Sequence, residues 1–181
     1  MGSHHSLTSI KLARVPKPRR LHTFKLWNDI LSYSFDSLSF SPLKNFPDIY
    51  ATEGGYFISK ELLMAITLEF KRFLFLAAYA MPNQDMVPPP LVDRLWRLVL
   101  TSSELYNRFC ERVLRPGEFL HRSSKQILSL KNYQATRERY AQLFGRDPPC
   151  ELWPDVSSQE ELESAHRFFR LKPSIFQKFK F

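Results

Sequence analysis

KELLMAITLEFKRFLFLAAYAM, residues 60–81, decides the fold, because it contains the most apolar stretch of the chain, residues 62–81. Ser59 can cap a helix here and Pro82 would stop it. Apolar residues nearly surround the second half of that helix, as is typical of a central, buried element. Three charged residues interrupt the stretch: Glu69, Lys71 and Arg72. Its uncharged remainder is shorter than the roughly 20 residues that cross a bilayer. The pattern therefore predicts a helix buried in protein.

The remaining sequence favours more helices joined by loops. Gly is scarce, at 5 of 181 residues, whereas 13 residues are Pro. Scarce Gly disfavours tight β-hairpins, which depend on Gly for positive φ. We expect a mainly α protein, a small helical domain with extended basic N- and C-terminal arms. Residues 1–55 are predicted to form the N-terminal arm, 56–154 the helical module, and 155–181 a short helix and a C-terminal tail.

Four further helices are predicted from caps and apolar spacing. One begins near Leu91, after a run of three prolines. A second starts at Thr101–Glu104, which has the spacing of a capping box. A third begins at Ser124 and ends at Gly145, and a fourth is capped by Ser158.

Both ends of the chain are basic. Residues 1–28 contain no acidic residue, and residues 167–181 read RFFRLKPSIFQKFKF, also without an acid. The net charge of +8 indicates an acidic partner such as nucleic acid, an anionic membrane or an acidic protein. Basic residues interleaved with aromatic ones can hold phosphates while stacking bases, or can fix a tail in apolar grooves of a protein. We predict partner binding by Lys11, Arg14, Lys17, Arg19, Arg20, Lys25, Arg167, Arg170, Lys172, Phe176, Lys178, Phe179, Lys180 and Phe181.

The N-terminal composition also bears on location. A basic, Ser- and Leu-rich start without acids is typical of a mitochondrial targeting segment, although a basic arm that contacts a partner has the same composition. Residues 1–6, MGSHHS, also match the N-myristoylation pattern at Gly2. A mitochondrial location is the first expectation, and a cytoplasmic or myristoyl-anchored one is the alternative.

No intact catalytic motif is present. The sequence lacks the phosphate-binding, dinucleotide-binding, zinc-protease and serine-hydrolase patterns. Four carboxylates have basic neighbours and the spacing of solvated helix faces: Asp93, Glu104, Glu111 and Glu118. Two cysteines do not make a disulfide framework, so a reducing compartment is expected.

Residues 87–154 resemble a known family. Successive matches are VDRLW at 92–96, YNRFC at 106–110, LH at 120–121, and FGRDPPCELWP at 144–154. Together they resemble the glycine-rich-domain-containing protein family, a helical module whose biochemical role is poorly defined. The resemblance implies a metal or catalytic cluster built around a W-H-x-H motif.

This sequence departs from that motif, since it reads WRLV at 96–99 and has lost both histidines. Cys110, His121 and Cys150 remain as dispersed candidates, whereas a structural zinc site normally needs four ligands. We therefore expect no metal and no cofactor.

These features predict a non-enzymatic accessory subunit of a large assembly, such as a respiratory or ATP synthase complex or a mitochondrial ribosome. Its expected partners are other protein subunits, with RNA or anionic lipid as further anionic partners, and no small-molecule substrate. One alternative is a ribosomal-type protein that contacts RNA. Another is a degenerate enzyme with a residual metal site around Cys110 and His121.

Overall fold

The structure is a computed structural model, which describes residues 17–35, 58–80, 85–114, 119–120 and 128–168. The described part contains six helices and no strand, which confirms the mainly α fold class. They are α1 (Lys17–Ser32), α3 (Lys60–Ala80), α4 (Pro90–Leu100), α5 (Ser103–Val113), α6 (Leu130–Phe144) and α7 (Gln159–Phe168).

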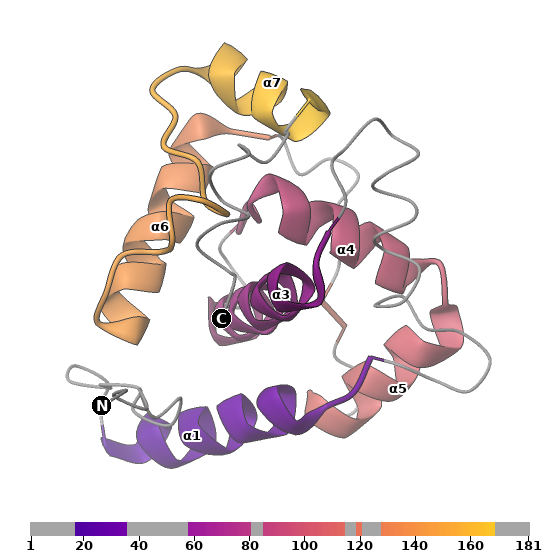
Figure 1. Cartoon of the computed structure of the whole chain (residues 1–181). Coiled ribbons are helices and arrows are strands. Elements are labelled where there is room, and N and C mark those ends of the chain that lie inside the picture. Colours follow the sequence, from indigo (N-terminus) through magenta and orange to yellow (C-terminus); the bar gives the residue numbers. More distant parts are fainter. Residues whose placement is uncertain (1–16, 36–57, 81–84, 115–118, 121–127, 169–181) are drawn as a thin grey trace, which may run out of the picture.

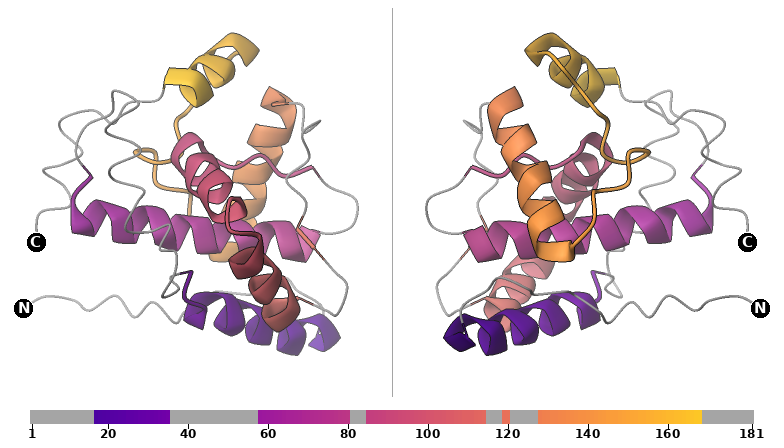
Figure 2. Two further views of the ribbon diagram at one scale, coloured as in Figure 1. Left: turned by 90° about the vertical axis from the view of Figure 1, so that its right-hand side faces the viewer. Right: turned by 90° about the vertical axis from the view of Figure 1, so that its left-hand side faces the viewer.

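The apolar stretch quoted above forms α3, the central helix of the fold. It contacts α1, α4 and α6, while α4 in turn contacts α5 and α7 (Figure 1). Figure 2 shows α1 and α7 on opposite sides of the molecule, with α3 and α4 between them. Residues of α3 that are fully buried include Leu62, Ile66, Phe70 and Phe73–Leu76. The prediction of a buried central helix is confirmed, and no described helix is long and apolar enough to cross a membrane.

Two predicted caps are present where the sequence placed them. The Ser59 Oγ accepts a hydrogen bond from the Leu62 N–H at 3.2 Å, and the Ser158 Oγ accepts one from the Glu161 N–H at 3.1 Å. Gly145 ends α6 in the left-handed conformation, with φ 68°, where a residue without a Cβ is favoured.

One predicted helix start is confirmed and another is wrong. α5 begins at Ser103, within the predicted Thr101–Glu104 stretch, although its N-cap is Ser102 and the Thr101 hydroxyl donates to the Leu98 carbonyl of α4. The helix expected from Ser124 is α6, which begins at Leu130 with Ser129 as its N-cap. Gln159 of α7 stabilises this start, because its side-chain Oε1 accepts a hydrogen bond from the Leu130 N–H at 2.9 Å. Ser124 itself lies outside the described residues.

The expected N-terminal arm is wrong for residues 17–35, because α1 belongs to the core. Trp27 packs edge-on against Phe75 of α3 and Phe144 of α6, with ring centroids 5.5 and 5.7 Å away. At the C-terminal end of α1, the Lys71 Nζ donates to the Leu31 carbonyl at 2.6 Å, which places a cation at the negative end of the helix. The pattern missed this helix because its buried and exposed faces both mix polar and apolar residues.

The boundary expected after residue 154 does not separate two cores. Val156 and Leu162 belong to the same buried cluster as the residues of α3 and α4. Residues 1–16 and 169–181, the remainder of the two expected arms, lie outside the described residues.

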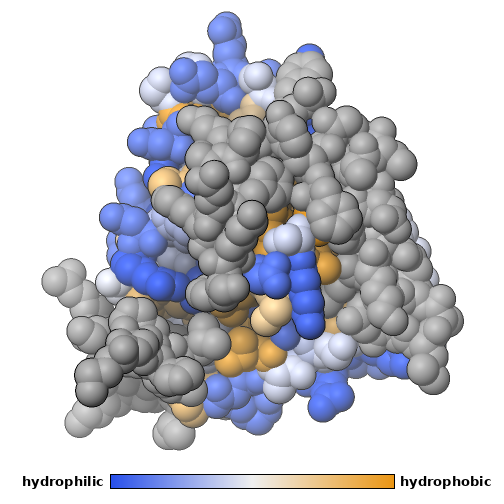
Figure 3. Space-filling model, viewed as in Figure 1, coloured by the Kyte–Doolittle hydropathy of each residue, from blue (hydrophilic) through white to orange (hydrophobic). Residues whose placement is uncertain are grey.

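Figure 3 shows that the outer side of α6 is largely hydrophilic, which leaves its other side for the core.

Candidate functional site

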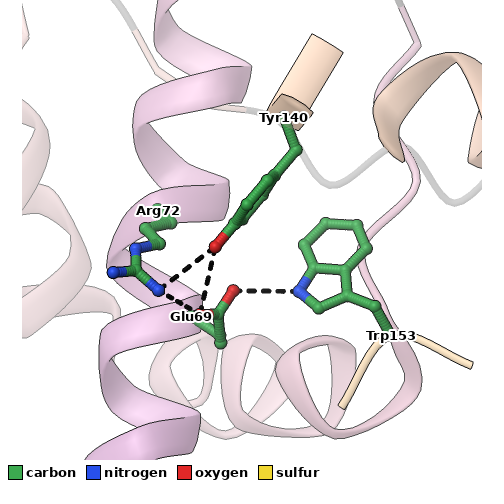
Figure 4. Close-up of polar contacts among 4 residues, drawn as sticks. All are labelled: Glu69, Arg72, Tyr140 and Trp153. Atoms are coloured by element: carbon green, nitrogen blue, oxygen red, sulfur yellow. Dashed lines mark hydrogen bonds and ion pairs between the residues drawn. The ribbon is translucent and has the colours of Figure 1, made fainter. Parts of the chain in front are cut away.

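In the described part of the chain, a group of buried, hydrogen-bonded polar side chains lies around Glu69 of α3. We call Glu69, Arg72, Tyr140 and Trp153 the Glu69 cluster (Figure 4). The Glu69 and Arg72 side chains are only 3% and 10% exposed, respectively. One helical turn separates them on α3, whereas Tyr140 comes from α6 and Trp153 from the segment after it.

Both carboxylate oxygens of Glu69 are occupied. Its Oε1 forms an ion pair with the Arg72 Nη1 and accepts a hydrogen bond from the Tyr140 hydroxyl at 3.3 Å. Its Oε2 accepts a hydrogen bond from the Trp153 Nε1–H at 2.9 Å. The Arg72 Nη1 also donates to the Tyr140 hydroxyl oxygen at 3.1 Å. The buried charge of Glu69 is therefore paired and hydrogen-bonded, as burial requires.

The electrostatics of the Glu69 cluster keep Tyr140 protonated. Burial raises the pKa of the Tyr140 phenol above its ordinary value, and the nearby Glu69 carboxylate raises this pKa further. The Arg72 guanidinium acts in the opposite direction and also lies 5.7 Å from the centre of the Phe144 ring, within cation–π distance. A protonated phenol can donate to the carboxylate throughout the neutral range.

The Glu69 cluster is arranged to hold chain segments together. It joins α3, α6 and the residue 145–154 segment through hydrogen bonds that use both oxygens of Glu69. The Tyr133 hydroxyl fixes the same segment by donating to the Pro154 carbonyl at 3.0 Å. A carboxylate engaged in this way serves as a structural acceptor.

A second charged cluster surrounds the buried Asp93 carboxylate, between α4 and α7. The Arg97 Nε and Nη2 donate to the Asp93 Oδ2 at 3.0 and 2.7 Å, and the His166 Nδ1 lies 3.8 Å from the same oxygen. Asp93 is 5% exposed, so the expectation that it lies on a solvated face is wrong. Packing of α7 against α4 covers this carboxylate, which sequence spacing within α4 alone could not reveal. Glu104 and Glu111 are exposed as expected, and Glu118 lies outside the described residues.

The metal candidates differ in their surroundings. Cys110 is buried in the core, where burial raises the pKa of its thiol, whereas Cys150 is exposed. His121 lies outside the described residues. Among the residues that the structure describes, no three His, Cys, Asp or Glu side chains gather as metal ligands would. The expectation of no bound metal stays a prediction that elemental analysis of the purified protein can test.

The predicted partner-binding residues fall into three groups. Lys17, Arg19 and Arg20 lie in the first turn of α1, and Lys25 is exposed one turn further on. Arg167 is exposed in the last turn of α7, where its carbonyl accepts a hydrogen bond from the Arg94 Nη2 at 3.4 Å. The others lie outside the described residues: Lys11, Arg14, Arg170, Lys172, Phe176, Lys178, Phe179, Lys180 and Phe181.

Sequence reasoning missed the Glu69 cluster. Its only signal in the sequence is an acidic residue, Glu69, and a basic residue three positions later, Arg72, in the most apolar helix. Residues at this spacing lie side by side on a helix, so an ion pair between them would be buried with that helix. Tyr140 and Trp153 are 71 and 84 positions away from Glu69, so their part in the cluster depends on tertiary packing.

Comparisons with known proteins add no relative, since no family model, curated protein or solved structure matches the chain. The resemblance of residues 87–154 to the glycine-rich-domain-containing protein family therefore stays a prediction from the sequence.

Proposed function

We propose that this chain is a non-catalytic accessory subunit of a large macromolecular assembly, which binds its neighbours through its two basic ends. The distribution of charge carries this proposal. Residues 1–28 and 167–181 contain 11 of the 26 basic residues and none of the 18 acidic ones. Residues 29–166 therefore contain 15 basic and 18 acidic residues, a net charge of −3. The positive charge that attracts an anionic partner is concentrated at the ends of the chain.

The helical body supports a structural role in this proposal. Its buried ionisable groups in the Glu69 cluster engage one another, and its second buried carboxylate, Asp93, is paired with Arg97. The first arrangement joins α3 to α6, and the second keeps a buried carboxylate paired within α4. A rigid body with charged, aromatic ends is suited to occupying a fixed position among other subunits.

A mitochondrial host is the version of the proposal that the composition of residues 1–28 favours. The position of α1 limits where a mitochondrial targeting segment could be cleaved from the chain. Thr23, Trp27 and Ile30 are buried in the core, so cleavage that preserves the fold has to occur before Thr23. N-terminal sequencing of the protein from its native cells tests this version.

Sedimentation of the native protein tests the wider proposal. The full chain should travel with a heavy complex at low salt and move to light fractions as the salt concentration rises, because salt screens the charges at its ends. A variant that lacks residues 169–181 should be released at lower salt than the full chain. This deletion keeps Arg167, which belongs to α7. If both proteins sediment as free monomers at every salt concentration, the chain has no stable partner and the proposal is wrong.

A further inference from the structure

We draw no further inference here: the strongest candidate, the side-chain cluster of Asp93, Arg97 and His166 between α4 and α7, belongs to the site already described, its Arg97 guanidinium is paired with Asp93, and its His166 Nε2, although without a hydrogen-bond partner, is buried where no ligand reaches it.

Discussion

The Trp153 indole N–H donates to the Glu69 Oε2 at 2.9 Å, which joins two residues 84 positions apart in the sequence. Trp153 and Glu69 are both buried, and Trp153 also contacts the rings of Tyr133 and Tyr140. This bond attaches the segment after α6 to the central helix. The residue 145–154 segment therefore depends on a polar contact as well as on apolar packing.

Trp153→Phe should lower the free energy of unfolding by about 1–3 kcal/mol, because it leaves one buried carboxylate oxygen without its donor. Urea unfolding followed by circular dichroism measures this change. Trp96→Phe is the control, since the Trp96 Nε1 has no hydrogen-bond partner among the described residues. Equal losses in the two variants would show that ring volume matters and the hydrogen bond does not.

Glu69→Leu should cost about 3–5 kcal/mol, because it leaves the Arg72 guanidinium buried without its counter-ion. Adding Arg72→Met to Glu69→Leu should restore part of this loss, since the double variant buries no unpaired charge. Urea unfolding of the two single variants and the double variant gives the coupling energy between them. Strictly additive losses would contradict the ion pair.

Leu76→Asp should cost at least about 3 kcal/mol, since it places an unpaired charge where the structure has a fully buried side chain. Met64→Asp on the same helix should change stability by about 0.5 kcal/mol or less, because Met64 is exposed. Thermal unfolding compares the two variants. A melting temperature unchanged by Leu76→Asp would mean that this side of α3 faces solvent.

Stability should fall as the pH rises above about 10, where tyrosines ionise in the unfolded chain. Burial is the main cause that raises the pKa of Tyr133 and Tyr140 in the folded protein. A raised folded-state pKa stabilises the fold below the unfolded value, and this contribution is lost as the pH rises toward the folded value. Phenolate absorbance should therefore rise in two steps as the pH increases. The second step, from the buried tyrosines, should coincide with unfolding. Complete ionisation of a protein that is still folded would refute this explanation.

The sequence predicts the central helix well because its signals are local. Ser59, the apolar run of α3 and the Gly145 stop each act within one or two helical turns, and all are present in the structure. Contacts between distant segments are harder to predict. The place of α1 in the core depends on Trp27 meeting Phe75 and Phe144, which no local pattern reveals.

The candidate sites also differ in whether the sequence alone predicts them. The basic composition of the two ends is visible in the sequence, so the partner-binding prediction needs no structure. Burial of Asp93 depends on α7 covering α4, and the Glu69 cluster depends on α6 reaching α3. From the sequence alone, the charged residues in both places would be assigned to the solvent-exposed surface, because only the packing of helices buries them.

Lysine footprinting tests most directly whether the basic ends carry the binding. Acetylation rates of the chain in its heavy native complex are compared with those of the free purified chain. Our account predicts slower acetylation in the complex at the end lysines, Lys11, Lys17, Lys25, Lys172, Lys178 and Lys180. It predicts unchanged rates at Lys60 and Lys131, which are exposed on the helical body. Protection of Lys60 and Lys131 with unchanged rates at the end lysines would contradict it.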